Sequence, residues 1–488
     1  MITSSQGPNK PLVIFWRNQA DSAAYEAART QRLFNAQSPA RYPLAIAFVK
    51  TQSEVADTVK LAIEKNCRLS VRAGGHSYAS WSVRDEAILV DLRDLSEGPI
   101  LDNNTGIAHV SPSMTGNDLV SYLSAKGRFF SPGHCPNVGL GGFLLGGGMG
   151  WNCNVRGILC PSCSTFKVIA RHILSKKKNW GWACEQVVAV DVVTADGSLV
   201  RADTQQNADL FWAARGAGPA FPGVVTRFHL QTRPAPKQMR SSGYVYPIKH
   251  YMTAFNWALK IPSGLDDGIE IVAIGSYPEG LDEPCITLAI LVYGDQEESI
   301  SEILQRLDES HPKGAVARWF CEETTIQKEF EKKAQAYPTD HRYFVDDAWL
   351  KDDIDVAAVL KPAFTKLPTK KSLVLWESMI PCSRRNLPDM AVSMQSDHYV
   401  ALYAIWEHEV DDTRCHSVIN EIMEQVGKQS VGAYLGEVDF RTRKTKFWGD
   451  EQRKRIMEIR HKWDPKGRIC GCLGLDEMNG FCHPEKKG

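Results

Sequence analysis

The sequence lacks any long hydrophobic run. No stretch approaches the roughly 20 consecutive apolar residues that a membrane-spanning helix needs. Near the N-terminus, the apolar run PLVIFW (11–16) is too short for the core of a secretory signal, and Lys10 is the only basic residue before it. These observations predict a cytoplasmic protein with no membrane partner.

The sequence also lacks an excess of charge of either sign. Lysine and arginine number 57, aspartate and glutamate number 57, and the two basic runs are local, at 175–180 and 441–446. A nucleic-acid-binding protein would carry a basic surplus, so this balance argues against such a partner.

A disulfide framework is not indicated either. The thirteen cysteines are an odd number spread along 488 residues, which favours reduced thiols. Cys160 and Cys163 have the spacing of zinc ligands, and Cys153 and Cys184 flank them, but no second pair stands at finger spacing. We expect unligated thiols and no metal, with a zinc site as the alternative.

Several common catalytic motifs are absent. The GxGxxG fingerprint of dinucleotide-binding folds fails because Leu144 takes the place of its third glycine. The segment 75–79 almost forms a GxSxG nucleophile elbow, but ends in Ala79. No P-loop and no HExxH zinc site occurs. A serine hydrolase and a P-loop enzyme are therefore not indicated.

The first half of the chain reads as α/β. Residues 42–49 read as a strand, and 51–66 as a helix whose Thr51 and Glu54 have capping-box spacing. A second strand (68–77) runs into two glycines. Further along, 117–127 reads as a helix and 187–203 as a hairpin turning at Asp196-Gly197.

After residue 235 the pattern changes. Strands are predicted within 240–410, among them 372–378 and 399–408, and amphipathic helices lie between them. This alternation predicts an antiparallel sheet with helices on one face, so the whole chain is classed as α+β. A last helix is predicted over 447–465.

Three glycine-rich loops follow strands or helices in the first half, at 73–75, 133–150 and 216–223. The second, GHCPNVGLGGFLLGGGMGW (133–151), also carries a cysteine. Glycine loops allow backbone N–H groups to converge on an anion such as a pyrophosphate. One such loop can be a simple tight turn, but three together favour a large phosphorylated cofactor.

At these residues the sequence resembles the FAD-linked oxidases of the vanillyl-alcohol-oxidase/PCMH superfamily. VRAGGHSY (71–78) is similar to their R-x-G-G-H-S loop, and the stretch 133–151 is similar to the G-x-C-x-x-V-G-x-G-G motif of the berberine-bridge-enzyme-like branch. Residues 208–234 resemble the third FAD loop, and YLGEVDF (434–440) resembles the C-terminal signature of microbial members.

The resemblance implies a PCMH-type, two-part FAD-binding domain and a substrate domain with an antiparallel sheet backed by helices. We place an N-terminal segment at 1–40, the FAD-binding domain at 41–235, the substrate domain at 236–430 and a returning C-terminal segment at 431–488.

The resemblance also implies which residues hold FAD. His76 would be bonded to the 8α-methyl of the flavin and Cys135 to its C6; the alternatives are a non-covalent histidine and a small buried thiol. The expected cofactor-binding residues are Arg72, Ala73, Gly74, Gly75, His76, Ser77, Gly133, Cys135, Val138, Gly139, Gly141, Gly142, Gly146 and Val224.

Other positions bear on catalysis. Val138 matches the family's oxygen gate, where valine accompanies oxidase behaviour; the alternative is a packed core valine. Tyr434 and Glu437 match the catalytic end of the C-terminal signature, although its usual asparagine is Gly436 here. Tyr403 and Trp406, on the strand 399–408, would give the substrate wall an aromatic character.

One segment interrupts the resemblance. Removing the 24 residues 158–181 joins the two flanking stretches in the family's register. The segment is either a translated retained intron or gene-model error, or a true insertion over the cofactor; long irregular loops are uncommon in compact domains.

The sequence as a whole predicts an FAD-dependent oxidase. It would remove a hydride from a C–H next to O or N of a sugar, alcohol or secondary metabolite and reduce O2 to H2O2. The alternatives are a dehydrogenase with another electron acceptor and an inactive homologue.

Overall fold

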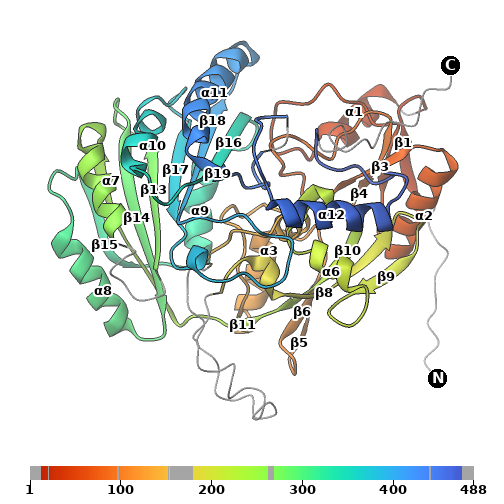
Figure 1. The fold of residues 1–488 in the computed structure, drawn as a ribbon, viewed down its shortest axis with the longest axis horizontal. Helices are drawn as coiled ribbons and strands as arrows, with labels where there is room; N and C mark the ends of the chain where they lie inside the picture. Colours follow the sequence, from red (N-terminus) through yellow and green to blue (C-terminus); the bar gives the residue numbers. More distant parts are fainter. Residues whose placement is uncertain are drawn as a thin grey trace.

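The computed structural model describes residues 12–19, 21–95, 98–151, 153, 180–261, 269–438 and 441–474. Residues 158–179, most of the suspected insertion, and the cysteine pair at 160 and 163 lie outside these ranges. Among the described helices, none is long and apolar enough to cross a membrane. The described chain forms two layered halves, on the right and left of Figure 1.

The first half begins with a four-stranded sheet in the order β1-β2-β4-β3. Its two helices are α1 and α2, and β2, β4 and β3 run parallel, as the predicted β-α-β unit requires. β1 pairs antiparallel with β2, so this sheet already includes residues before position 41. The bounds are β1 (Val13–Trp16), α1 (Ser22–Thr30), β2 (Ala45–Phe48), α2 (Gln52–Glu64), β3 (Arg68–Arg72) and β4 (Ala87–Asp91).

The predicted capping box of α2 is confirmed. The Thr51 side chain accepts a hydrogen bond from the backbone N–H of Glu54 at 3.2 Å, and the Glu54 carboxylate accepts one from the backbone N–H of Thr51 at 3.3 Å. This cap fixes where the helix begins, and β3 then delivers the chain to the first glycine loop.

A second sheet has the order β5-β6-β10-β8-β9 and is antiparallel. The hairpin β8–β9 turns at Asp196-Gly197, as predicted, and Gly197 has φ +86°. The bounds are β5 (Ile100–Asp102), β6 (Ile107–Val110), α3 (Gly116–Ser124), β7 (Arg128–Phe129), α4 (Leu140–Leu145), β8 (Val187–Thr194), β9 (Leu199–Ala202), α6 (Ala208–Ala213), β10 (Gly223–Gln231) and β11 (Arg233–Pro234).

The other half contains an eight-stranded sheet, β15-β12-β14-β13-β17-β18-β16-β19, in which all neighbouring strands pair antiparallel. The bounds are β12 (Gln238–Pro247), α7 (Tyr251–Lys260), β13 (Ile269–Ser276), β14 (Cys285–Gly294), α8 (Glu297–Ser310), β15 (Ala317–Glu323), α9 (Ile326–Ala336), β16 (Arg342–Leu350), α10 (Val356–Thr365), β17 (Leu373–Ser378), β18 (His398–Trp406), α11 (Asp412–Lys428) and β19 (Ser430–Gly432).

The two faces of this sheet have different partners. Helices α7, α8, α10 and α11 pack on one face in a single hydrophobic core, which confirms the predicted antiparallel sheet with helices behind it. The other face packs against residues of the first half, among them Met149 and Trp182. α9 lies between the two halves (Figure 1). The second face therefore forms a wall opposite the glycine loops.

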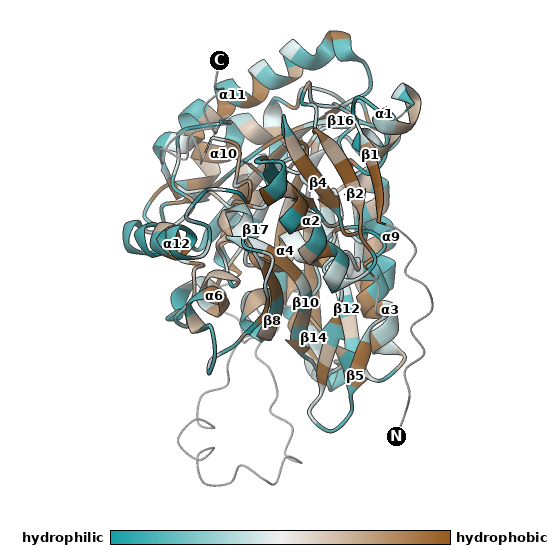
Figure 2. Cartoon of the chain, turned by 90° about the vertical axis from the view of Figure 1, so that its right-hand side faces the viewer, coloured by the Kyte–Doolittle hydropathy of each residue, from teal (hydrophilic) through white to brown (hydrophobic). Residues whose placement is uncertain are grey.

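The chain finally returns to the first half through α12 (Asp450–Trp463), the predicted C-terminal helix. Its exposed side is hydrophilic, whereas strands β2 and β4 are hydrophobic (Figure 2). After α12, Leu69 of β3 donates to the Arg468 carbonyl and accepts from the Cys470 N–H, both at 2.8 Å. The C-terminal segment thus adds an edge to the first sheet beside its glycine loop.

Candidate active site

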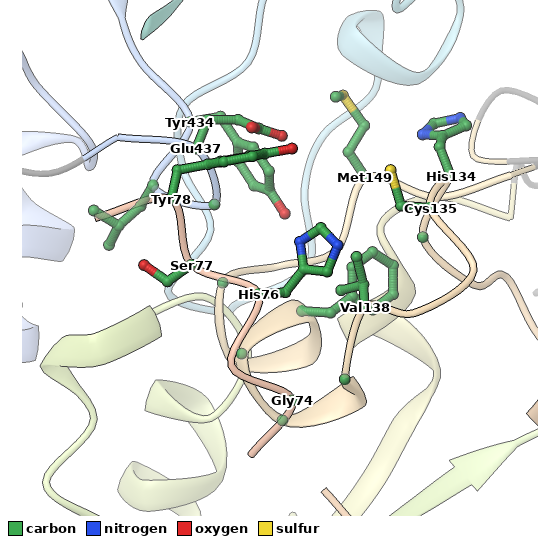
Figure 3. A pocket seen from close by; sticks show the side chains of 18 of the residues that line it. Gly74, His76, Ser77, Tyr78, His134, Cys135, Val138, Met149, Tyr434 and Glu437 are labelled. Atoms are coloured by element: carbon green, nitrogen blue, oxygen red, sulfur yellow. The ribbon is translucent and has the colours of Figure 1, made fainter. Parts of the chain in front are cut away.

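A cavity of about 460 Å³ lies between the glycine loops and the free face of the large sheet. This volume falls within the range of small-molecule and cofactor sites. Its lining comes from the loops after β3, before and within α4, and before β10, from the segment after β19, and from residues 469–471. Figure 3 shows side chains from three of these segments pointing into one space.

The loop after β3 presents His76. Its ring stacks on Phe34 with centroids 4.0 Å apart, and its Nε2 atom is buried without a hydrogen-bond partner in the described part of the chain. Burial lowers the imidazole pKa to about 4, so the ring is neutral at physiological pH. Gly75, just before it, has φ +73°, and a Cβ there would lie 1.8 Å from the Arg32 carbonyl oxygen, so no other residue fits.

Arg72 holds the first loop in place through its side chain. Its guanidinium is fully buried and forms an ion pair with Asp91 at 2.7 Å. It also donates to the carbonyls of Ala28 and Arg29 at 2.5 and 2.7 Å. These partners are all protein groups, so Arg72 anchors the loop, and it also lines the cavity.

The glycines mainly bring the loops close to each other. A Cβ on Gly74 would lie 2.7 Å from the Gly139 nitrogen, and one on Gly139 would meet Gly74 at the same distance. A Cβ on Gly141 would lie 2.9 Å from the Cβ of Ala73. A Cβ on Gly142 would have no described atom within 4 Å. Among the expected cofactor-binding glycines, Gly142 is therefore the one that leaves open space at the cavity wall. The remaining glycines meet protein atoms too: Gly133 faces Phe143, and Gly146 faces the Gly142 carbonyl.

The second loop places Cys135 across the cavity from His76 (Figure 3). Burial raises the pKa of the Cys135 thiol to about 12, so it is a neutral thiol at physiological pH. Val138 also lines the cavity and is only half-buried, so it is not a packed core valine. Ser77 and Ala73 line the same cavity from the first loop.

The third loop corrects one expected residue. Val224 is fully buried in the core beneath the first sheet, together with Val193 and Leu69, and does not line the cavity. Its neighbours Gly223 and Val225 do line it. Side chains alternate along a strand, so a shift of one residue moves a side chain from the cavity to the opposite face.

Tyr434 and Glu437 lie beside each other after β19 (Figure 3). The Tyr434 backbone N–H donates to Asp347 at 2.6 Å, and burial raises the phenol pKa although the backbone of Met149 and Gly148 hydrogen-bonds to it. A Cβ on Gly436 would lie 2.4 Å from the Tyr434 ring. The glycine that replaces the usual asparagine therefore permits this ring position.

Glu437 carries the perturbed carboxyl of this segment. Its Oε2 atom is buried and has no hydrogen-bond partner among the residues that the structure describes, and burial raises the pKa of the carboxyl to about 7. A hydrogen bond from Tyr403 to the carboxylate opposes this rise. The group is therefore close to half ionised at neutral pH, which suits a general base.

The sheet wall contains functional groups that sequence reasoning missed. Glu377 of β17 and Tyr399 of β18 line the cavity, as does Tyr337 after α9. Of the two aromatic residues expected there, Tyr403 lines the cavity, but Trp406 lies in the core on the helix-covered face. Side chains alternate between the two faces of a strand, so residues an even number apart share a face. Tyr399 is four residues from Tyr403 and could have been predicted at the cavity, whereas Trp406 is three residues from it and could have been excluded.

No group of three or more potential metal ligands occurs among the described residues. The cavity instead has the features of a cofactor site: the orphaned Nε2 of His76, the open wall at Gly142, and glycine loops that meet backbone to backbone. These residues fit a large, planar, phosphorylated group such as FAD.

A two-part α/β half with glycine loops, facing an antiparallel sheet across one cavity, defines a PCMH-type flavoprotein. A family model described as "FAD binding domain" matches residues 43–172. The chain is 38% identical over 465 residues to the FAD-linked oxidoreductase penO of Penicillium crustosum, covering 95% of this chain and 97% of that protein. The chain therefore belongs to the family of FAD-linked oxidoreductases and is an FAD-dependent oxidoreductase.

Two further likenesses are informative. A carbohydrate oxidase of Microdochium nivale is 34% identical over 236 residues, which cover 48% of this chain and 42% of that protein. The solved structure of Physcomitrella patens BBE-like 1 superposes with a TM-score of 0.76 at 17% identity, covering 94% of this chain and 95% of that one. This structural likeness supports the berberine-bridge-enzyme-like fold.

Proposed function

We propose that the protein is an oxidase that removes a hydride from a C–H next to O or N of a small molecule and reduces O2 to H2O2. The observation that carries the proposal is the placement of Glu437. Its unpartnered carboxylate oxygen, with a pKa of about 7, lies in the same cavity as His76 and Cys135. A proton acceptor and the two expected flavin tethers therefore share one enclosed space.

Bound FAD supplies the acceptor for the hydride and afterwards the electrons for oxygen. The chain's own residues orient the substrate and handle its proton. Ionised Glu437 accepts the proton from the substrate's O–H or N–H as the hydride leaves carbon. Tyr403 donates a hydrogen bond to this carboxylate and keeps it oriented. Tyr434 keeps its own proton, because burial raises its pKa.

We also propose that the flavin is covalently held by both His76 and Cys135. The neutral His76 ring and the Cys135 thiol both line this cavity at separate places (Figure 3), which supports two separate tethers. Peptide mapping by mass spectrometry of the flavin-loaded protein tests this directly. In the unaltered protein we expect the mass of flavin on both the peptide with His76 and the peptide with Cys135. Either single variant, His76→Ala or Cys135→Ala, should carry flavin on the remaining peptide only. The double variant should carry it on neither. Unmodified Cys135 in fully loaded protein would refute the second tether.

Oxygen as the electron acceptor is supported by Val138, a small side chain at the cavity wall. We expect Val138→Leu to slow reoxidation by O2 by roughly tenfold or more, which is about 1.4 kcal/mol on the barrier. Reduction of a dye acceptor should change little. Stopped-flow reoxidation measures both. Equal slowing with both acceptors, or no slowing, would contradict the role of Val138, and slow reoxidation of the unaltered protein by O2 but not by the dye would favour a dehydrogenase.

The substrate class is proposed from the wall of the cavity. Tyr78, Tyr337, Tyr399 and Tyr403 line it together with aliphatic residues of the sheet. Such a wall favours an alcohol, amine or secondary metabolite with an aromatic or apolar body. The carbohydrate oxidase match covers less than half of this chain, so it gives little support for a sugar. Oxygen consumption and peroxide release with matched aromatic and sugar alcohols test this choice.

A further inference from the structure

Glu377 is a carboxylate in the cavity wall that the proposed reaction does not use. It lies on β17, between Val272 of β13 and Tyr399 of β18, which are its direct partners across the sheet. All three residues line the cavity. Residues directly opposite in an antiparallel sheet point to the same face, so Glu377 and Tyr399 present their polar ends to the same space.

Neither polar group has a hydrogen-bond partner among the described residues. Glu377 is 4% exposed, and the His134 Nε2 atom lies 3.9 Å from its carboxylate. His134 cannot neutralise it, because burial lowers the imidazole pKa to about 3 and leaves the ring uncharged. The Tyr399 hydroxyl is buried, and no described residue hydrogen-bonds to it. Buried polar groups of this kind normally have partners, so a ligand group is the natural one.

Other charges near Glu377 do not supply that partner. Lys333 of α9 lines the cavity and its positive charge lowers the pKa of Glu377, but among the described residues it makes no ion pair within 4.0 Å with that carboxylate. Glu270, on the same face of β13 and two residues from Val272, accepts a hydrogen bond from Tyr293 at 3.1 Å. Glu270 and Glu377 together outweigh the single charge of Lys333, so this end of the cavity favours a cation over an anion.

Aromatic rings lie beside Glu377. Tyr399 is its direct neighbour on β18, and Trp151 packs edge to face on His134, whose Nε2 atom is 3.9 Å from Glu377, with ring centroids 4.5 Å apart. A carboxylate beside aromatic rings is the arrangement that recognises alkylammonium groups, because the ring faces attract a cation that the carboxylate neutralises. A neutral hydroxyl would gain only the hydrogen bond.

We propose that Glu377 and Tyr399 bind a protonated nitrogen of the substrate, so that the substrate is a hydrophobic amine. This inference rests on the proposed function, which places the substrate in this cavity. What it adds is the chemical class of the substrate. Glu377 anchors the ammonium group, whereas Glu437 accepts the proton of the reaction.

The test compares amines with alcohols of the same shape. Tryptamine with tryptophol, and 2-phenylethylamine with 2-phenylethanol, are titrated into the flavin-loaded protein under anaerobic conditions, with calorimetry as the readout. We expect each amine to bind roughly tenfold or more tightly than its alcohol, the size of one charged hydrogen bond. Glu377→Gln should abolish this preference, and Glu377→Asp, which keeps the charge, should retain part of it.

Glu322→Gln is the matched control, because Glu322 is an exposed carboxylate on the same sheet that does not line the cavity. It should keep the full preference for amines. The flavin spectrum of each variant shows whether it has folded. Equal binding of amines and alcohols by the unaltered protein overturns the proposal, as does an unchanged preference in Glu377→Gln. Because these titrations need no turnover, failure of the oxidase proposal would appear separately, as an absence of oxygen consumption.

Discussion

Tyr434 and Glu437 are three residues apart, yet their environments give them different roles. Burial raises both pKa values, but it brings that of Glu437 to about 7 while that of Tyr434 moves further from neutrality. Only the carboxylate can therefore lose and regain a proton near physiological pH. The sequence alone left the choice between a carboxylate and a tyrosinate open.

This difference predicts a pH profile. Below a pH of about 7 the Glu437 carboxyl holds its proton and cannot accept another, so the rate of anaerobic flavin reduction should rise as the pH increases through that value. Glu437→Gln should lower the rate by roughly 10²–10⁴-fold and remove the dependence. Rapid-mixing absorbance at saturating substrate measures the rate.

Glu377→Gln serves as the control for this profile, because Glu377 also has a pKa raised to about 7 by burial. At saturating substrate its replacement should leave the rise with pH in place. If instead Glu377→Gln removes the dependence and Glu437→Gln retains it, the two carboxylates have been assigned the wrong way round.

At the scale of elements, the glycine loops hold each other in place. Gly74→Ala should push the first loop away from the backbone of Gly139, at a cost of about 1–3 kcal/mol for overpacking, and reduce the FAD content. Gly98→Ala is the control, since a Cβ there meets nothing within 4 Å. The flavin-to-protein absorbance ratio after purification measures the effect. Equal FAD content in the two variants would contradict this account of the loops.

Two described residues on either side of most of the suspected insertion are in contact. The Gly181 N–H donates to the Cys153 carbonyl at 3.0 Å. Removing 158–181 would join Gly157 directly to Trp182. Gly157 would then take the place of Gly181, whose φ is +73°, a value that glycine adopts easily. Its N–H could donate to the Cys153 carbonyl in the same way and close a five-residue turn from 153 to 157. We therefore expect the shortened chain to load as much FAD as the full chain, or more.

Trp180 allows a matched comparison of deletions. It is 7% exposed and packs on Phe129 at 4.8 Å and under Arg233 at 5.1 Å. Removing 156–179 also takes out 24 residues but keeps this tryptophan. If both deletions load FAD, the segment is dispensable; a loss in both would show that it is a true part of the enzyme. If FAD is lost only in the deletion of 158–181, which also removes Trp180, the effect is assigned to that side chain. Spliced transcripts lacking these codons would support the retained-intron interpretation.

At the scale of the whole molecule, the C-terminal segment completes the first half. Arg460 of α12 is fully buried and donates to the Ala220 carbonyl at 3.2 Å and to the Ile469 carbonyl. The Asp464 carboxylate accepts from the backbone of Arg468 and Ile469 at 2.7 and 2.8 Å. This supports our proposal that residues 431–488 return to a FAD-binding domain built largely from 41–235, beside a substrate domain at 236–430.

Truncation after Trp463 tests this return. It removes Asp464, the edge pairing with Leu69 and one acceptor of the buried Arg460, so we expect a loss of roughly 3–5 kcal/mol, the cost of an uncompensated buried charge. FAD should be lost too, because residues 469–471 line the cavity. Truncation after Gly474 keeps every contact described here and is the control. Thermal unfolding with and without added FAD measures both effects, and equal behaviour of the two chains would contradict the proposal.

The sequence by itself determined the local features of this protein. The capping box of Thr51 and Glu54, the hairpin turn at Asp196-Gly197 and the order of the glycine loops depend on neighbours within a few residues, so spacing reveals them. The family resemblance added the fold and the cofactor, and the comparisons with known proteins confirm both at the level of an FAD-dependent oxidoreductase.

Only the tertiary structure decided what faces the cavity. Whether a strand residue points inward depends on register, and a one-residue shift separates Val225, at the cavity, from Val224, in the core. Glu377, Tyr399 and Glu437 come from separate elements, and their pKa values and missing partners arise only when three segments enclose the same space. The stretch 133–151 suggested a cofactor, but the fold showed that its glycines chiefly join one loop to another.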